Sequence, residues 1–429
     1  MAEKPPTTSL RSNVRPHDLI TPPQTPEKVV EISNEDVSPC LDDARRREKR
    51  GENLTYGVAI GQQECSKKST QAVSHALNAD AMLDPLPGIP DSARRYQGSY
   101  QLHEQIGYGA WSHVYRASEL TPKIDVGPQV HPPLTPPSSP GTSERASTTL
   151  RLAVKTVARR DGKLVLEKEA RILTYLHSQS ESSRYLVPFY GNEPASCSIV
   201  MACIQPTLED HAQQAAKVPL TTATMFEPVV GVQEWYQLAL DLISGLVFLK
   251  GCGCIHGDIK PANVLLQPSE GNQAGHVLRP LYCDFSSSHI ITPKLALKEI
   301  EEISAVTTEY TAPELIRAFR PRRHEVNNDR AVATFASDVF SLGVTLLFAA
   351  TGQSPYNQAA IQFQKIAMAE EGEPMQYAQA GSQASRVLPE QGVHSLLNRA
   401  FAKSNQRIHA DTWEVMAIEA VRSRTGSGS

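Results

Sequence analysis

The sequence predicts an α+β protein in which a small, strand-rich lobe precedes a larger helical lobe. Two observations carry this prediction: short segments between residues 100 and 158 alternate between apolar and polar side chains, whereas most of the chain after residue 204 has helical spacing. The first 97 residues show neither period and are rich in Pro, Ser and Thr, so we expect a disordered tail. The chain therefore divides into a tail (1–97), a two-lobed domain (98–422) and a short flexible end (423–429).

The smaller lobe is predicted from short alternating segments. We expect two strands joined by a Gly-bearing turn in “YQLHEQIG” and “HVYRASEL”, a third strand in “RLAVKTVA” and a buried strand in “SIVMACI”. Residues 121–149 are too rich in Pro and Ser for a strand or helix, so they predict a disordered loop inserted between two strands. “KLVLEKEARILTYLHS” has helical spacing. Its expected buried stripe is Leu164, Leu166, Ile172, Leu173 and Leu176.

The larger lobe is predicted from longer helical patterns. “VQEWYQLALDLISGLVFLKGCG” is amphipathic and has Gly251 and Gly253 as stop signals. “ASDVFSLGVTLLFAATG” is almost entirely apolar after its start, which indicates a core helix, and “VHSLLNRAFAK” and “DTWEVMAIEAV” are expected helices near the end of the chain. A cleft between the two lobes is the expected place for a ligand.

Composition excludes several classes of protein. The chain has 42 Lys and Arg against 46 Asp and Glu, a net charge of −4, so we expect no general attraction to nucleic acid or anionic membranes. No apolar run reaches the roughly 18–20 residues of a membrane span, and the N-terminus lacks the apolar core of a signal peptide. The seven cysteines show no paired C-x-x-C spacing, which favours reduced thiols over disulfides or zinc. We therefore expect a cytoplasmic and/or nuclear protein of open oligomeric state, with a monomer favoured.

The tail carries two short signals with alternative readings. “ARRREKR” (44–50) is either a nuclear-import signal or a solvated helical patch. Thr21 and Thr25 each precede a Pro and are either sites for a proline-directed kinase or chance pairs in a Pro-rich segment.

Five short motifs occur in a fixed order along the two-lobed domain. They are “IGYGAWSHV” (106–114), “LAVK” ending at Lys155, “CIHGDIKPANVLL” (254–266), “LYCDFSSS” (281–288) and “TTEYTAPEL” (307–315). In this order they resemble the motifs of a eukaryotic-type Ser/Thr protein kinase, over residues 100 to 421. The resemblance implies a bilobal protein-kinase fold with its smaller lobe at 98–204 and its larger lobe at 205–422.

The resemblance also implies ATP and Mg²⁺ in the cleft, with transfer of the γ-phosphoryl group to Ser or Thr hydroxyls of protein substrates. Glycines let backbone N–H groups approach phosphate oxygens, and a Lys–Glu pair holds an ammonium group beside them. The residues implied to bind the nucleotide are Ile106, Gly107, Gly109, Val114, Ala153, Lys155, Glu169, Met201 and Cys203.

The catalytic and metal-binding residues are implied in the same way. Asp258 would accept or steer the proton of the substrate hydroxyl, and Lys260 would neutralise charge on the transferred group. Asn263 and Asp284 carry the hard oxygen atoms that Mg²⁺ prefers. Taken alone, each motif has a simpler reading: the glycines fit a hairpin turn, and Lys155 fits a solvated strand position. Four supporting features are implied as well: His256 bracing the loop, Thr307 bonded to Asp258 and Lys260, Asp338 bonded to the loop backbone, and a Glu314–Arg407 ion pair.

Three positions depart from the family pattern. Ser112 stands in place of the third glycine of the first motif, and Ser286 in place of the glycine after Phe285. Gly257 stands where family members have an Arg that can pair with a phosphate on the activation segment. We therefore hypothesise that activity does not depend on such a phosphate being bound at residue 257.

Insertions relative to the family lie at 121–149, 267–280 and 317–331. The last one carries four basic residues, which either select acidic or prephosphorylated substrates or form a solvated loop. These residues are Arg317, Arg320, Arg322 and Arg323.

Three functions fit the motifs. The first is an active protein Ser/Thr kinase, which the retention of Lys155, Asp258, Asn263 and Asp284 favours. The second is a pseudokinase that serves as a binding or scaffold module of the same fold. The third, transfer to a small-molecule hydroxyl, is disfavoured by the “APE” segment, which in the family builds a surface for docking a peptide.

Overall fold

The computed structural model describes residues 89–120, 151–219, 221–268, 278–291, 307–319 and 331–425. All of them belong to one compact unit, 70–429. The two tail signals, the 121–149 loop and three of the four basic residues of the last insertion lie outside the described residues.

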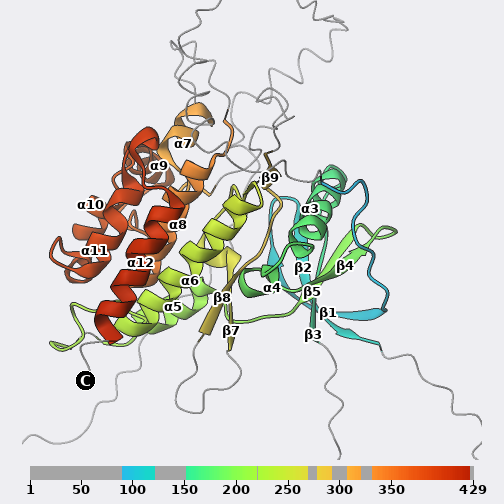
Figure 1. Cartoon of the computed structure of the whole chain (residues 1–429), viewed down its shortest axis with the longest axis horizontal. Helices are drawn as coiled ribbons and strands as arrows, with labels where there is room; N and C mark the ends of the chain where they lie inside the picture. Colours follow the sequence, from blue (N-terminus) through green and yellow to red (C-terminus); the bar gives the residue numbers. More distant parts are fainter. Residues whose placement is uncertain are drawn as a thin grey trace, which may run out of the picture. The chain divides into compact units, whose positions relative to one another are not determined.

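Five antiparallel strands form the sheet of the smaller lobe, in the spatial order β1-β2-β3-β5-β4 (Figure 1). They are β1 (Tyr100–Tyr108), β2 (Ser112–Glu119), β3 (Arg151–Val157), β4 (Phe189–Glu193) and β5 (Ser198–Ala202). The four strands predicted from the sequence are confirmed, and β4 is the strand of this sheet that the sequence analysis did not predict.

β3 is central in the sheet, and its two faces meet different neighbours. Leu152 and Val154 are fully buried in a small cluster with residues from β2 and β5. Because side chains alternate along a strand, Ala153 and Lys155 face the opposite side, where helix α3 (Gly162–His177) packs on the sheet. The fold therefore directs Lys155 towards α3.

Helix α3 buries most of its predicted apolar stripe, but the assignment of Leu164 is wrong. Leu166 and Ile172 are 1% and 0% exposed, and Leu173 and Leu176 are equally buried, whereas 74% of Leu164 is exposed. Two residues along an α-helix correspond to a rotation of about 200°, so Leu164 and Leu166 point to opposite sides.

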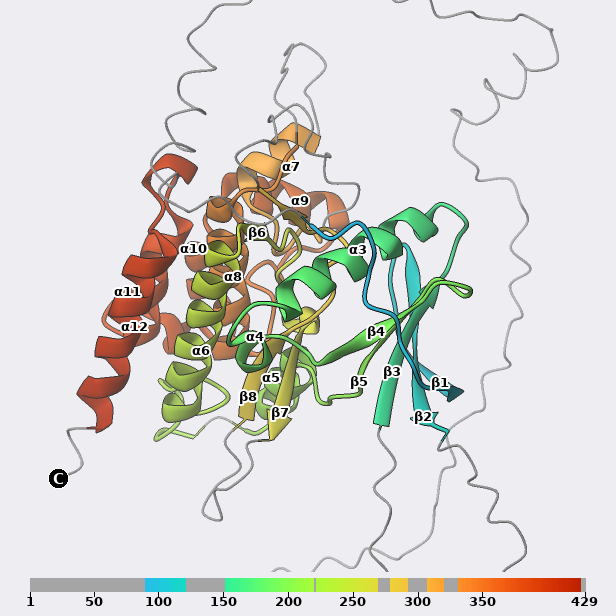
Figure 2. The ribbon, with the colours of Figure 1, turned by 45° about the vertical axis from the view of Figure 1, so that its right-hand side comes forward.

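The larger lobe is mainly helical, as predicted, and α6 packs along both α8 and α12 (Figures 1 and 2). Its helices are α5 (Leu208–Ala216), α6 (Val232–Gly251), α7 (Pro313–Phe319), α8 (Phe335–Thr351), α9 (Gln362–Glu371), α10 (Pro374–Gln379), α11 (Gly392–Leu397) and α12 (Ala410–Thr425). A one-turn helix, α4 (Ser182–Tyr185), precedes β4. No helix among these residues is long and apolar enough to cross a membrane.

Helix α8 is the predicted core helix, and its ends are well defined. Its N-cap Thr334 accepts a hydrogen bond from the backbone N–H of Ser337, whose side chain accepts one from the Thr334 N–H in return. Gly352 ends the helix with a left-handed φ of 69°, where glycine meets no Cβ penalty. Nearly every residue between these caps is buried. The expected helix at 393–403 is shorter than predicted: α11 ends at Leu397 and a tighter 3₁₀ turn follows.

Two short antiparallel strand pairs bring two loops of the larger lobe together. Strands β7 (Val264–Pro268) and β8 (Leu278–Tyr282) pair antiparallel, and so do the two-residue strands β6 (Cys254–Ile255) and β9 (His289–Ile290). The loop between β6 and β7, which ends in a 3₁₀ turn at Pro261–Asn263, therefore lies beside the loop between β8 and β9.

Residues 89–97, which the sequence analysis assigned to the tail, lie against the smaller lobe and hydrogen bond to it. The domain boundaries remain predictions, and these contacts are a reason to place the N-terminal boundary close to residue 89.

The contrast between Leu164 and Leu166 is testable. We expect Leu166→Ala to lower the free energy of unfolding by about 2–5 kcal/mol, because it removes a fully buried side chain and leaves a cavity. Leu164→Ala should change it by less than about 0.5 kcal/mol, because that side chain is exposed. Urea unfolding of both variants measures the difference, and equal losses would contradict the orientation of α3.

Candidate active site

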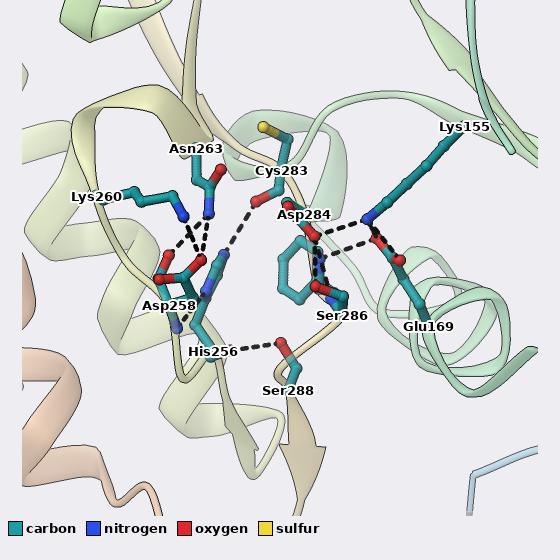
Figure 3. A network of polar contacts seen from close by, with 11 residues as sticks. Lys155, Glu169, His256, Asp258, Lys260, Asn263, Cys283, Asp284, Ser286 and Ser288 are labelled. Atoms are coloured by element: carbon teal, nitrogen blue, oxygen red, sulfur yellow. Dashed lines mark hydrogen bonds and ion pairs between the residues drawn. The ribbon is translucent and has the colours of Figure 1, made fainter. Parts of the chain in front are cut away.

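A buried ammonium group joins two carboxylates at one end of the polar network of the site (Figure 3). Lys155 Nζ donates to both carboxylate oxygens of Glu169, at 2.8 and 2.7 Å, and to Oδ1 of Asp284 at 2.7 Å. Lys155 and Glu169 are only 3% and 1% exposed. Burial would lower the pKa of Lys155, but the two carboxylates outweigh it and raise the pKa above its usual value. The lysine is therefore a fixed cation that joins β3, α3 and the loop after β8.

Glu169 also contacts the loop after β8 directly. Its Oε1 accepts the backbone N–H of Phe285 at 3.1 Å. The Phe285 ring is fully buried and lies 4.8 Å from the ring of His256, measured between centroids. One carboxylate on α3 thus holds both Lys155 and the backbone next to Asp284.

Asp284 presents its two oxygens differently. Oδ1 accepts hydrogen bonds from Lys155 and, at 2.7 Å, from the Ser286 hydroxyl, whereas no hydrogen bond to Oδ2 is found among the described residues. Burial would raise the pKa of Asp284, but Lys155 and the Ser286 hydroxyl hold it well below its usual range. The group is therefore a carboxylate with one oxygen available to a cation.

Ser286 stands where the family has a glycine, and its backbone conformation shows whether a glycine is needed at this position. The described non-glycine residues with positive φ are Glu181, Cys197 and Asp284, so Ser286 has an ordinary backbone conformation that does not need glycine. The unusual conformation is that of Asp284, with φ at 62°, a region that Asp tolerates better than most residues.

A second cluster forms around Asp258 in the loop between β6 and β7. Lys260 Nζ donates to Asp258 Oδ2 at 2.6 Å and to the Thr307 hydroxyl at 2.9 Å. Thr307 donates to Asp258 Oδ1 at 3.2 Å, and Asn263 Nδ2 donates to the backbone carbonyl of Asp258 at 2.9 Å. Burial raises the pKa of Asp258, although Lys260 acts in the opposite direction. The predicted contacts of Thr307 are confirmed.

Helix α8 anchors the loop between β6 and β7 through Asp338. Asp338, in the first turn of α8, accepts the backbone N–H of His256 at 2.7 Å and that of Gly257 at 3.0 Å. Asp338 is 1% exposed, so the two bonds satisfy a carboxylate that water does not reach. The predicted contact between Asp338 and the loop backbone is confirmed.

His256 braces the loop, as predicted, and the structure indicates its protonation. Its Nε2 lies 3.1 Å from the carbonyl oxygen of Cys283, and its Nδ1 accepts the backbone N–H of Asp258 at 3.3 Å. This pattern assigns the neutral tautomer with the proton on Nε2. Full burial lowers the pKa of His256 to about 4, which keeps the ring neutral at physiological pH. The Ser288 hydroxyl completes the brace by donating to the His256 carbonyl at 2.8 Å.

The structure gives a reason for glycine at position 257 that the sequence did not reveal. Its φ is 79°, and a Cβ at this position would lie 2.7 Å from the carbonyl oxygen of Ser287. Any side chain here would meet both backbone strain and a collision with the loop after β8. The sequence analysis considered only the loss of an Arg side chain, because Ser287 is thirty positions away in the sequence.

The residues predicted to bind a nucleotide line up across the sheet. Gly107 pairs with Val114, which pairs with Lys155, and Ala153 pairs with Met201 on β5. Ile106 lies next to Gly107 on β1, Gly109 lies in the turn to β2, and Cys203 follows β5. Apart from Lys155, none of these residues is labelled in the polar network of Figure 3. Their roles remain predictions.

The packing around Gly107, near the end of β1, and Gly109, in the turn to β2, does not require glycine. A Cβ at Gly107 or Gly109 would make ordinary contacts of 3.5 Å or more, and neither residue has a positive φ. The turn is closed instead by the Gly109 N–H, which donates to the Ser112 carbonyl at 2.8 Å. Packing within the protein therefore does not explain the choice of glycine at these two positions.

A cavity of about 470 Å³ opens beside the Asp258 cluster. Lys260 and Thr307 line it, together with Glu209 on α5 and Glu309. Near the end of the same segment, Arg407 forms two hydrogen bonds with Glu314, at 2.7 and 3.2 Å, so the predicted ion pair is confirmed. This pair anchors the segment from residue 307 to α7 on the larger lobe.

The burial of His256 predicts a pH dependence of stability. Between pH 6.5 and about 4 the unfolded chain binds a proton at this residue that the folded protein does not bind. Stability from this group is therefore complete above pH 6.5 and falls as the pH decreases, by up to about 1.4 kcal/mol per pH unit. We expect His256→Gln to flatten the curve of unfolding free energy against pH in this range. Parallel curves for the two proteins would contradict the prediction.

Comparison with known proteins identifies the family. Residues 143–412 match the protein kinase domain family. The chain is 26% identical over 280 residues to serine/threonine-protein kinase ISR1 of Saccharomyces cerevisiae, covering 61% of this chain and 53% of that protein. It is 25% identical over 264 residues to serine/threonine-protein kinase RUNKEL of Arabidopsis thaliana, covering 60% of this chain and 14% of that protein.

A dual-specificity relative also matches. The chain is 26% identical over 227 residues to dual specificity mitogen-activated protein kinase kinase 7 of Homo sapiens, covering 52% of this chain and 46% of that protein. The chain thus spans about half or less of the length of these relatives. The family match begins at residue 143, after β1 and β2. The pairing of β2 with β3 places these two strands in the same sheet as the matched residues. The match covers more than half of the chain, and the smaller lobe is built mainly of strands and the larger lobe mainly of helices, as expected. The chain therefore belongs to the protein kinase domain family.

Proposed function

We propose that this protein is an active kinase that transfers the γ-phosphoryl group of ATP to Ser or Thr hydroxyls of proteins. The observation that carries the proposal is the connected polar network of Figure 3. In it a buried Lys155 contacts Glu169 and Asp284, and Asp258 contacts Lys260 and Asn263. These are the residue types that phosphoryl transfer needs in order to position groups and stabilise charge.

The donor atoms fit Mg²⁺. Asn263 uses its Nδ2 to donate to Asp258, which leaves its carbonyl oxygen, and Asp284 has Oδ2 without a hydrogen bond among the described residues. Both are hard oxygen ligands, and Asp284 stays ionised because Lys155 lowers its pKa. Bound Mg²⁺ would neutralise charge on the phosphates of ATP.

The smaller lobe fits the remainder of a nucleotide. Gly107 on β1 pairs with Val114 on β2, which pairs with Lys155 on β3. These pairings bring the backbone of β1 and β2 next to the strand that carries the buried ammonium group. The two glycines of the turn have no role in packing, which supports a role in letting a phosphate approach the backbone. We propose that Ile106, Ala153, Met201 and Cys203 contact the base, as the resemblance implies.

The Asp258 cluster supports the transfer step. We propose that Asp258 accepts or steers the proton of the substrate hydroxyl, and that Lys260 holds charge on the transferred group. Burial raises the pKa of Asp258, which makes it a stronger base than an exposed carboxylate. Lys260 and Thr307 hold its two oxygens in one orientation.

The neighbourhood of Asp258 favours a protein substrate over a small molecule. The cavity beside Lys260 is lined by four separate segments, and its wall at residues 307–310 is fixed by the Glu314–Arg407 pair. Such a surface is suited to a polypeptide that presents a Ser or Thr at Asp258. We further expect protein partners rather than nucleic acid or membranes, a monomer, and a cytoplasmic and/or nuclear location.

A pseudokinase is the alternative function. Degenerate members of the fold commonly lack the lysine, a metal ligand or the catalytic carboxylate, whereas all of these residue types occur here, in two hydrogen-bonded clusters. The substitution at Ser286 does not weaken this argument, because its hydroxyl holds Asp284 in place.

The first test removes the proposed base. We expect Asp258→Asn to lower the rate of phosphoryl transfer by about 10²–10⁴-fold, because an amide retains the shape but cannot accept the proton. The assay uses ATP labelled in its γ-phosphate, Mg²⁺ and generic protein substrates, followed by identification of the phosphorylated amino acid. Asp161→Asn, which changes an exposed carboxylate that pairs with Arg159 outside the network of Figure 3, is the control. Equal signal from Asp258→Asn and wild type, or none from either, contradicts an active kinase, and phosphotyrosine would contradict Ser/Thr specificity.

The second test concerns the activation segment. Gly257 has no side chain, and the Ser287 carbonyl occupies the space that one would need. We therefore expect transfer to survive alanine substitution of each Ser and Thr between Ser288 and Glu314, with the exception of Thr307. Rates are measured with the same assay. A loss of about 10³-fold at one position that an acidic residue restores would show that a phosphate is required.

A further inference from the structure

Residues 89–96, called the strap below, run along α3 before the chain enters β1 (Figures 1 and 2). The Arg171 side chain on α3 donates from Nε to the Pro90 carbonyl at 2.8 Å. The backbone N–H of Arg94 donates to the Thr174 hydroxyl, also on α3, at 2.8 Å. Ile89 and Ala93 pack against the main hydrophobic core to which α3 contributes. The strap is therefore attached to α3 at two points three residues apart on one face.

The other end of the strap is attached to the sheet. Asn192 on β4 donates its N–H to the Arg94 carbonyl at 2.8 Å, and the Tyr96 N–H donates to the Asn192 carbonyl at 2.9 Å. These bonds extend the sheet beyond β4 by a parallel bridge. The Tyr96 hydroxyl also contacts Glu119 at the end of β2. The strap thus ties α3 to the sheet on the side away from the site.

Gly191 indicates that this contact is built into β4. A Cβ at Gly191 would lie 2.5 Å from the Tyr96 nitrogen and 2.6 Å from the Arg95 carbonyl carbon. Both atoms belong to the backbone and cannot move aside as a flexible side chain could. Glycine is therefore the residue that lets the strap approach β4 so closely.

The geometry of α3 connects the strap to the site. Glu169 precedes Arg171 by two residues and Thr174 by five, which correspond to rotations of about 200° and 140° around the helix axis. Its carboxylate therefore leaves α3 on roughly the opposite side from the strap, where it meets Lys155. A shift of α3 towards or away from the strap would change the distance between Glu169 and Lys155.

We propose that the strap positions Glu169 for its contact with Lys155, and that Arg171 and Thr174 are the positioning residues through which it acts. The strap lies between the N-terminal 88 residues and the domain, so a partner or modification that displaced it would release α3. The rate measurement below rests on the proposed function, whereas the exchange measurement does not.

The test uses the full chain carrying Arg171→Met and Thr174→Val, which remove the donor to Pro90 and the acceptor for Arg94. We expect kcat/KM for ATP to fall about three- to tenfold, as the loss of one or two hydrogen bonds predicts. In a Glu169→Gln background the same pair should cost less than about twofold, because the strap would then have no carboxylate to position. Arg171→Lys and Thr174→Ser, which keep a donor and an acceptor, should restore most of the rate.

Hydrogen exchange gives a readout that needs no activity. The Phe285 N–H donates to Glu169, so we expect it to exchange faster in the strap variant, without a matching loss in unfolding temperature. Glu167→Ala, which breaks an exposed ion pair elsewhere on α3, is the matched control and should change neither measurement. If the double variant fails to fold, Thr174→Val alone is used.

The outcomes separate the two proposals. Equal rate losses with and without the Glu169 carboxylate, or unchanged exchange at Phe285, would show that the strap only stabilises the domain and overturn the inference. An inactive wild-type protein would overturn the proposed function, and faster exchange at Phe285 in the strap variant would still support the positioning of Glu169.

Discussion

The structure of the site depends on one desolvated cation. An ammonium group that is 3% exposed would be costly without partners, and Lys155 meets two carboxylates from different parts of the chain. Glu169 comes from a helix and Asp284 from a loop of the other lobe, so the charge requirement brings the lobes together at this point. The positive φ of Asp284 and the bond from Phe285 to Glu169 are consequences of the same arrangement. A change in either carboxylate would therefore disturb the whole site.

Much of the fold could be predicted from the sequence because local pattern determines it. The strands on both sides of the insertion and the core helix α8 follow from alternation and from apolar content. The error at Leu164 arose because an apolar residue at the start of a helix fits either side of a stripe until the packing is known. β4 was missed because “FYGNE” is short and contains a glycine, and that glycine serves a contact with residues almost a hundred positions earlier.

The site was predicted through the order of motifs, and its supporting contacts were predictable only in part. Thr307, Asp338 and the Glu314–Arg407 pair occur where the resemblance implied. The reason for Gly257 was not predictable, because it depends on the approach of the Ser287 backbone. The strap was missed for a similar reason: its contacts are mainly backbone hydrogen bonds, which leave no apolar period in the sequence.

The hydrogen bonds that Asp338 accepts from the His256 and Gly257 amides attach the Asp258 loop to α8, whereas the Glu169 carboxylate is carried by α3. Asp338 belongs to α8, in which nearly every residue is buried, so the loop that carries Asp258 is attached to the hydrophobic core itself. Glu169, in contrast, lies on α3, which packs on one face of the sheet of the smaller lobe. We therefore expect the loop of the larger lobe to open only when the core opens, whereas the position of α3 is the one that the strap is proposed to set. A site built in this way combines a preorganised half with an adjustable half.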